Sequence, residues 1–279
     1  MKQYKQKMTE PQKKHIGKRL GRGWTAEVYE WEDNQALKLF MDWWPQARAE
    51  YEFKTTKFAS EAGLPVPAVF QAVTLQGRNG IVMERISGKN MLKMMISNSL
   101  KTKHYAHILA ELQTRINKIE GPAEFQTVRQ RLENAVNNDT FIPRDIKSSS
   151  LRVLNKLPDG KALCHFDLHP MNIIMSPKGP IVIDWSGSNK GAPEADIART
   201  WMLCTLPPIA IVSNWPMNLW VKYFYKEFLK KYASLTDIDE EMVENWKIPI
   251  LAGRIIEERT EARKKFLLGV LEKRIRGKS

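Results

Sequence analysis

Short β-prone runs alternate with glycines and turn residues in the first third of the chain. Between residues 15 and 40 this pattern predicts three antiparallel strands joined by tight turns. A helix is expected at 46–61, and Gly63 and the prolines that follow would end it. Two further strands, at about 68–74 and 80–84, complete a small sheet.

After Gly88 the spacing of apolar residues changes from about two to about 3.6, which indicates amphipathic helices. Helices are expected at 103–118, 124–137, 146–155, 192–204, 215–233, 238–253 and 256–276. Two short apolar runs, 172–175 and 181–183, flank the turn SPKGP. The chain is therefore expected to be α+β and two-lobed, with a small antiparallel-sheet N-lobe containing one helix and a larger, mainly helical C-lobe. The expected segments are a basic extension at 1–14, the N-lobe at 15–87 and the C-lobe at 88–279.

Cysteine content and the termini bear on the compartment. Cys164 and Cys204 are too few for a disulfide framework, which favours two buried thiols in a reducing environment. No apolar run follows the basic N-terminus within the range of a signal peptide, so a cytoplasmic protein is expected. Residues 201–221 carry no charge and could cross a bilayer, but Pro207, Pro208 and Pro216 would break such a helix. No membrane span is expected.

The net charge of +13 raises the question of a nucleic-acid partner. The densest basic runs are the first 22 residues and the last helix, where Lys and Arg alternate with apolar residues and Glu272. That mixture is more typical of a solvated helix face than of a phosphate-binding surface, so no nucleic-acid partner is expected.

The segment HFDLHPMN, from His165 to Asn172, carries most of the candidate chemistry. Asp167 and Asn172 lie five residues apart, and Asp184 follows the apolar run IVI. Oxygen ligands spaced in this way, together with one acid, suit phosphoryl transfer. Asp167 would accept the proton of an acceptor hydroxyl, and Asn172 and Asp184 would hold Mg²⁺.

These residues, followed by Asp196 in GAPEADIART, resemble the aminoglycoside phosphotransferase and choline kinase-like family. The resemblance covers about 16–199 and implies a protein-kinase-like fold that binds ATP or GTP with magnesium. It also implies that Asp196 braces the catalytic loop and that His165 positions it. Gly21 and Gly23 in GRGWTAEVYEW are similar to the family's phosphate-covering loop, and Lys38 to its phosphate-contacting lysine.

Two further roles follow from the resemblance. The carboxylate that orients Lys38 would be Glu52 or Glu50, and Glu52 is favoured because it shares a helix face with uncharged residues. Backbone groups of Glu84 to Ile86 would bind adenine, although an ordinary edge strand explains that segment as well.

Several departures qualify the resemblance. Phe166 stands where many family members carry glycine, and Trp185 replaces the phenylalanine of protein kinases. No activation segment is evident, which argues against a protein kinase. His169 is expected to be a hydrogen-bonded loop residue rather than a metal ligand. An aromatic and methionine series from Trp201 to Phe224 could form either helical core or a wall of the acceptor pocket.

The sequence therefore predicts a phosphotransferase that moves the γ-phosphate of ATP to a hydroxyl of a small molecule. A non-catalytic nucleotide-binding module and a protein kinase are the alternatives. The identity of the acceptor stays open. A basic protein is a poor electrostatic host for a polycationic aminoglycoside, so a neutral or anionic alcohol is an alternative to it.

Overall fold

The structure is a computed structural model that describes residues 16–206 and 215–277. The basic extension expected at 1–14 lies outside them. The described chain forms two compact units: unit 1 contains the residues up to Lys93 together with Met171–Gly187, and unit 2 contains Met94–Pro170 and the residues from Ser188 onward. The division into domains expected at residue 88 stays a prediction, because compactness alone does not define a domain.

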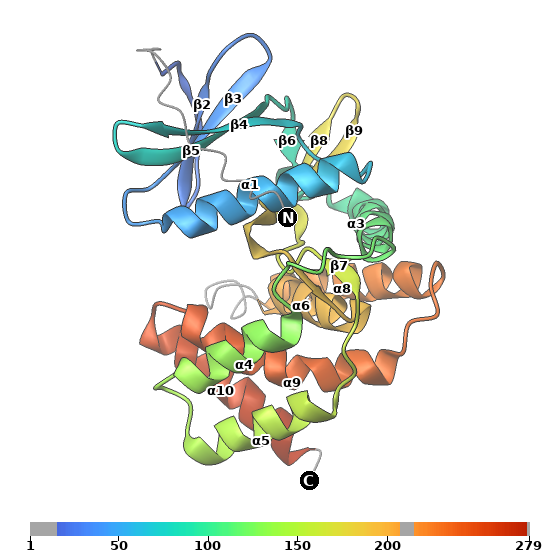
Figure 1. Cartoon of the computed structure of the whole chain (residues 1–279). Helices are drawn as coiled ribbons and strands as arrows, with labels where there is room; N and C mark the ends of the chain where they lie inside the picture. The colour runs from blue at the N-terminus through green and yellow to red at the C-terminus, as the bar shows by residue number, and fades with distance from the viewer. Residues whose placement is uncertain (1–15, 207–214, 278–279) are drawn as a thin grey trace. The chain divides into compact units, whose positions relative to one another are not determined.

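Unit 1 is built on a five-stranded antiparallel sheet in the order β1-β2-β3-β5-β4 (Figure 1). Its strands are β1 (Arg19–Arg22), β2 (Ala26–Glu30), β3 (Gln35–Phe40), β4 (Val69–Leu75) and β5 (Arg78–Glu84). One helix, α1 (Gln46–Glu61), packs against it. A second sheet joins β6 (Lys89–Asn90), β8 (Ile173–Ser176) and β9 (Gly179–Val182). The small antiparallel sheet with one helix is confirmed.

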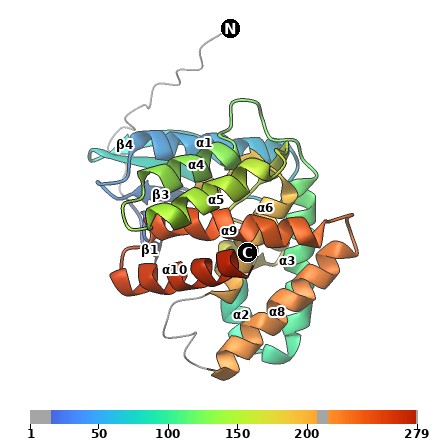
Figure 2. The same cartoon turned by 90° about the horizontal axis from the view of Figure 1, so that it is seen from below.

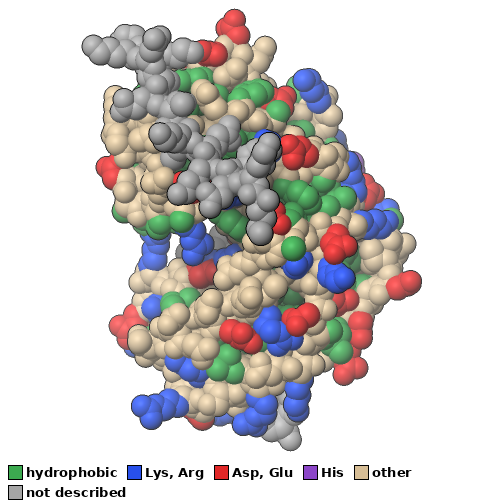
Figure 3. Space-filling model, in the orientation of Figure 1, with side chains coloured by type: hydrophobic (Ala, Val, Ile, Leu, Met, Phe, Trp, Pro, Cys, Tyr) green, Lys and Arg blue, Asp and Glu red, His purple; other side chains and the backbone are tan. Residues whose placement is uncertain are grey.

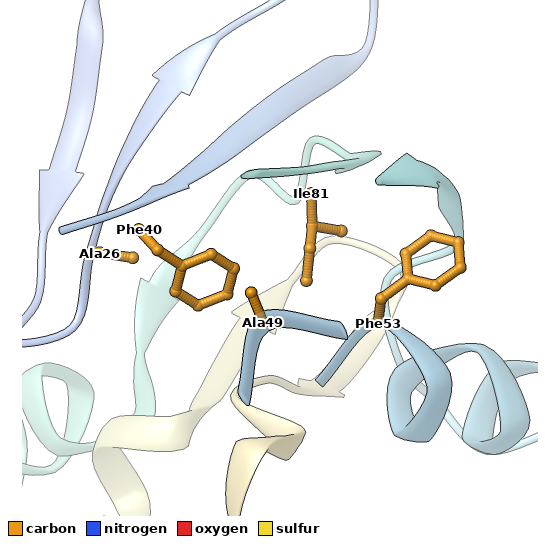
Figure 4. Close-up of a cluster of buried hydrophobic side chains, with 5 residues drawn as sticks. All are labelled: Ala26, Phe40, Ala49, Phe53 and Ile81. Carbon is orange, nitrogen blue, oxygen red and sulfur yellow. The ribbon is translucent and has the colours of Figure 1, made fainter. Parts of the chain in front are cut away.

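The alternation along β3 gives this sheet two apolar faces. Leu37 and Leu39 pack with residues of β4 and β5 on one face. Phe40 lies on the other face, in a cluster with Ala26, Ile81 and two residues of α1, which Figure 4 shows. Because side chains alternate along a strand, Lys38 points to the same side as Phe40 and therefore toward α1.

Unit 2 is mainly helical, as expected. Its helices are the end of α2 (Met91–Ser97), α3 (Thr102–Asn117), α4 (Val128–Asn138), α5 (Arg144–Lys156), α6 (Pro193–Thr205), α8 (Trp215–Ala233), α9 (Glu240–Glu257) and α10 (Glu261–Arg276). Helix α9 packs against α4, α5, α6 and α10, and α3 packs against α8 (Figure 2). Strands β7 (Ala162–Cys164) and β10 (Asn189–Gly191) form an antiparallel pair.

Three helix boundaries differ clearly from the sequence expectation. Helix α4 begins at Val128 rather than at 124 because Thr127 and Gln130 form a capping box there. Helix α9 does not end at Gly253 but continues to Glu257. A Cβ at Gly253 would lie 2.6 Å from Leu132 of α4, so this glycine permits close helix packing rather than ending the helix. The expected α10 is correspondingly shorter and begins after the Thr260 cap.

The described residues also bear on the membrane and nucleic-acid questions. No helix within 16–206 and 215–277 is long and apolar enough to cross a membrane, and residues 207–214 of the uncharged stretch lie outside those ranges. On the face of unit 2 visible in Figure 3, Lys and Arg are interspersed with Asp and Glu. Basic residues of α10 also pair with acids, Lys265 with Glu261 of the same helix and Arg274 with Glu244 of α9. Both cysteines are buried thiols.

Candidate active site

The two glycines of the expected phosphate-covering loop lie at the end of β1 and in the turn that follows it: Gly21 pairs with Val28 of β2, and Gly23 lies in the turn. The Gly23 N–H donates to the Ala26 carbonyl oxygen at 2.8 Å and closes the turn. A Cβ at Gly21 would meet no atom within 4 Å, and one at Gly23 would come no closer than 3.5 Å to its neighbours. The space beside this backbone is therefore open, which a closely approaching ligand requires.

Lys38 lies in the middle of β3 and reaches α1. Its ammonium group donates a hydrogen bond to Glu52 and forms an ion pair with it. Glu52 is only 2% exposed, on the buried face of α1. Glu50 accepts a hydrogen bond from Gln46 on the same helix instead. The structure thus brings Lys38 together with Glu52 and not with Glu50.

Asp184 completes this group in unit 1. The Lys38 Nζ lies 3.4 Å from Asp184 Oδ1, and the Ser186 hydroxyl donates to the same oxygen at 2.9 Å. Asp184 follows β9 with a φ of 65°, in the left-handed region that residues with a Cβ disfavour. The Ile183 N–H donates to the Asn172 carbonyl oxygen at 2.9 Å, which ties the Asn172 segment to the one that carries Asp184.

The three side chains Lys38, Glu52 and Asp184 place two carboxylates beside one ammonium. Burial alone would lower the pKa of Lys38, but the charges of Asp184 and Glu52 outweigh it and raise that pKa. Burial also raises the pKa of Glu52 to about 7; the Asp184 charge acts in the same direction and Lys38 opposes both. Lys38 therefore stays charged, and the cluster has an excess of negative charge once both acids ionise.

Trp185 anchors the segment that follows Asp184. The indole is fully buried and its Nε1 donates to the Val182 carbonyl oxygen at 3.2 Å. The Thr55 hydroxyl of α1 donates to the Trp185 carbonyl oxygen at 2.9 Å. Helix α1 thus holds both Glu52 and the Asp184 segment, a role for Thr55 that sequence reasoning missed.

In unit 2, Asp196 holds the backbone of the HFD segment from the first turn of α6. Its Oδ1 accepts from the Phe166 N–H at 2.8 Å and its Oδ2 from the His165 N–H at 3.3 Å. The Asn117 side-chain amide also donates to Oδ2, at 2.9 Å, and accepts from the Tyr232 hydroxyl at 3.0 Å. Burial raises the pKa of Asp196, and these hydrogen bonds act against that shift.

Asp167 is the partly exposed member of the same loop. Its N–H donates to His165 Nδ1 at 3.2 Å, which links the two residues locally. The Asp167 side chain is 31% exposed, and its Oδ2 lies 3.9 Å from His169 Nε2. Among the described residues no three His, Cys, Asp or Glu side chains gather as a metal site, so His169 belongs to no zinc cluster there.

The segment expected to bind adenine, Glu84 to Ile86, and the aromatic series have mixed environments. The Glu84 N–H donates to the Ala68 carbonyl oxygen at 2.7 Å, so this donor serves unit 1 itself. An N–H for adenine would have to come from Ile86.

Trp201 is nearly buried, whereas Trp215 and Tyr223 of α8 are 72% and 44% exposed. The aromatic series therefore divides into core and an exposed face of α8.

Several solved structures share this fold. A choline/ethanolamine kinase family protein from Mesorhizobium loti is 13% identical, with a TM-score of 0.63 over 94% of this chain and 88% of that one. The aminoglycoside phosphotransferase APH(4)-Ia, solved with AMP-PNP and hygromycin B, is 15% identical, with a TM-score of 0.61 over 93% and 92%. APH(3'')-Id from Streptomyces rimosus, solved with ADP and streptomycin, is 17% identical, with a TM-score of 0.54 over 83% and 91%. The protein-kinase-like fold is therefore confirmed.

Family membership follows from the sequence itself. The model of the phosphotransferase enzyme family matches residues 16–216, which span all the candidate site residues. This chain belongs to that family, and the membership supports a phosphotransferase. No curated protein matches the sequence.

Proposed function

We propose that this protein transfers the γ-phosphate of ATP or GTP to a hydroxyl group of a small molecule, with Mg²⁺ as the metal. The observation that carries the proposal is the cluster of Lys38, Glu52 and Asp184. A lysine on a central strand, kept charged by two acids from α1 and from the segment after β9, suits binding of nucleotide phosphates.

The donor set of unit 1 fits a magnesium ion. The single ammonium of the cluster can balance the charge of only one of its two carboxylates, and Mg²⁺ prefers oxygen ligands. Asp184 and the Asn172 side chain would hold the ion. Once bound, it would neutralise charge on the phosphate oxygens. The open backbone at Gly21 and Gly23 would approach the phosphates, and Glu84 and Ile86 would contribute backbone groups to adenine.

Asp167 would act as the general base. The acceptor O–H would give its proton to the Asp167 carboxylate while its oxygen forms a bond to the γ-phosphorus. The bond from that phosphorus to the β,γ-bridging oxygen breaks, and the nucleoside diphosphate leaves. Asp196 supports this role, since it holds the N–H groups of His165 and Phe166 and so fixes the backbone that carries Asp167.

The acceptor is expected to be a neutral or anionic alcohol. The net charge of +13 makes the chain a poor host for a polycation. The exposed face of α8, with Trp215, Leu219 and Tyr223 four residues apart, offers an apolar surface for such a molecule. Overexpression is therefore expected to confer no resistance to kanamycin-type drugs, and resistance would overturn this part of the proposal.

Thermal stabilisation by ATP or GTP, with and without magnesium, tests the nucleotide site. Wild-type protein should show a magnesium-dependent rise in Tm, and Asp184→Ala should lose it. Asp42→Ala is the matched control, because Asp42 is an exposed acid of unit 1 that pairs with Arg78. It should keep the shift. No nucleotide-dependent shift in wild-type protein would contradict the proposal.

Turnover separates catalysis from binding. Asp167→Asn should keep the magnesium-dependent shift and lose phosphoryl transfer by about 10³-fold, since general-base catalysis contributes on that order. Unchanged transfer in this variant would remove Asp167 from the mechanism. Labelled phosphate that enters protein rather than small molecules would favour a protein kinase, and binding without any transfer would favour a non-catalytic module.

A further inference from the structure

Phe166 is the strained residue of the catalytic loop. It stands between His165 and Asp167, its φ is 63°, and it is 1% exposed. A bulky residue in this left-handed conformation is an outlier, because its Cβ crowds the following carbonyl oxygen. Such a conformation persists only where the surroundings over-determine it. Asp196 binds the Phe166 N–H, but that bond leaves the ring and the carbonyl group to other partners.

Two arginines from different helices supply those partners. The guanidinium carbon of Arg131 on α4 lies 4.9 Å from the centroid of the Phe166 ring, and that of Arg199 on α6 lies 5.2 Å from it. Both distances are within the range of cation–π attraction, which is strongest where water is excluded. The Arg199 Nε also donates to the Phe166 carbonyl oxygen at 3.1 Å.

Glu257 holds these two like charges together. The Arg199 Nη2 lies 2.7 Å from its Oε2, and the Arg131 Nη2 lies 3.0 Å from its Oε1. Arg254, one turn earlier on α9, contributes a third ion pair at 2.9 Å. Arg199 is itself 3% exposed, so this pairing offsets the cost of burying its charge. Glu257 thereby fixes both guanidinium groups beside one ring.

The charge of Asp167, the expected base, also acts on Arg199 of this network. Burial lowers the pKa of Arg199, and the charges of Glu257 and Asp167 are among those that oppose the shift. Asp167 is therefore coupled to Arg199 in two ways, through the backbone of Phe166 and through the electrostatic field. A change in the network would therefore act on Asp167 by both routes.

We propose that Arg131, Arg199 and Glu257 are positioning residues that hold Phe166 in its left-handed conformation and so orient Asp167 for proton transfer. The proposal rests on the proposed function, because it assigns these residues to the same reaction. It differs from the role of Asp196, which binds the N–H groups of the loop. The network binds the ring and the carbonyl group on the other side of the same residue.

The test compares two variants that each remove one arginine from Glu257. Arg131→Met removes one ion pair, with Glu257, and a contact with the Phe166 ring, whereas Arg254→Met removes ion pairs with Glu257 and Glu258 and no such ring contact. With Mg–ATP and water as acceptor, Arg131→Met should lower kcat about tenfold while the KM for ATP stays within about twofold. Arg254→Met should keep kcat within about twofold. Equal losses of kcat in the two variants would overturn the proposal.

Hydrogen exchange provides a readout that does not need turnover. The N–H groups of Phe166 and Asp167 should exchange faster in Arg131→Met than in Arg254→Met, because the loop loses its ring contact only in the first. Arg131→Lys, which keeps a cation, should restore most of the protection. If wild-type protein shows no magnesium-dependent Tm shift with nucleotide, the proposed function fails while the exchange difference still supports the positioning. Equal exchange in both variants would contradict the positioning itself.

Discussion

Two partly or fully buried glutamates, Glu52 in unit 1 and Glu257 in unit 2, each pair with basic residues, but their pKa values shift in opposite directions. Burial raises the pKa of Glu52 to about 7. Burial would also raise the pKa of Glu257, yet three arginines outweigh it and lower that pKa far below its ordinary value of 4.5. The difference is one of stoichiometry, since Glu52 shares one lysine with Asp184, whereas Glu257 pairs with three arginines, of which Arg254 also pairs with Glu258.

This contrast separates a site with unbalanced negative charge, which can bind a cationic ligand, from a site whose carboxylate already has enough cationic partners. The unit 1 cluster gains from any added cation, because its two carboxylates face one ammonium. The unit 2 network is saturated with positive charge and supports the backbone around Phe166. The first arrangement suits a metal and a nucleotide that come and go, and the second suits a loop with one fixed conformation.

The largest effect is expected from Glu257→Gln. Removing this carboxylate leaves three neighbouring guanidinium groups without their shared counter-charge, so we expect a loss of about 4 kcal/mol in the free energy of unfolding at pH 7. Because the folded-state pKa is lowered, the stabilisation is fully present above pH 4.5 and is lost as the pH falls below it. The gap in Tm between wild type and variant should therefore narrow from pH 6 toward pH 3.

Glu261→Gln is the control for that experiment. Glu261 is an exposed acid of α10 that pairs with Lys265 one turn away, at 2.7 Å. Exposed pairs on helices contribute little, so its substitution should leave Tm nearly unchanged. If Glu257→Gln behaved like this control, the network would not be the saturated structural element that the comparison requires.

A smaller effect of opposite sign is expected from Glu52→Gln. The folded-state pKa of Glu52 is raised, so folding favours its protonated form, and that contribution is lost as the pH rises from 4.5 through about 7. Wild-type protein should lose up to about 3 kcal/mol over this range relative to the variant. The measurement is the difference in the free energy of unfolding at pH 5 and pH 8.

Glu50→Gln provides the matched control on the same helix. Glu50 accepts a hydrogen bond from Gln46 and does not belong to the Lys38 cluster. It should show no such pH-dependent difference. A wild-type stability that rises between pH 5 and pH 8 relative to Glu52→Gln would show that Lys38 dominates, and the two glutamates would then be alike.

The sequence predicted those parts of the molecule that depend on local patterns. Helix α1 occupies the expected residues, and Gly63 after it adopts the left-handed φ of 75° that a helix end favours. Alternation along β3 correctly indicated that Lys38 faces away from Leu37 and Leu39, and the helical face containing Thr55 indicated Glu52 as its partner. Each of these inferences needs only the period of a strand or of a helix.

The arginine network could not be predicted, because predictions of this kind need a local period in the sequence. Its members come from α4, α6 and the end of α9, and no local period connects them. Gly253 moreover suggested that α9 ends before Glu257, whereas it serves to admit Leu132. The grouping of Met171–Gly187 with unit 1 depends in part on the pairing of β8 with the two-residue strand β6, which is too short to produce a pattern.

The smallest effect concerns Trp24, at the turn between β1 and β2. Its ring lies 5.7 Å from that of Trp43, which in turn lies 5.7 Å from Trp44. Trp44 stacks on buried Phe40 at 6.5 Å, so a series of rings connects the turn to the core of unit 1. Trp24 and Trp43 are 61% and 55% exposed, and such a contact is expected to restrain the loop only weakly.

A double-mutant cycle of Trp24→Ala and Trp43→Ala measures that restraint. Aromatic pairs contribute about 1 kcal/mol beyond their burial, so the coupling energy from urea unfolding should be about 1 kcal/mol or less. A weak coupling means that the loop between β1 and β2 can move at little cost, in contrast to the loop around Phe166. A coupling above about 3 kcal/mol would be as large as that of strongly interacting residues and would make both loops equally rigid. The Lys38 cluster of unit 1 and the Glu257 network of unit 2 would then differ only in their charge balance, not in the rigidity of their loops.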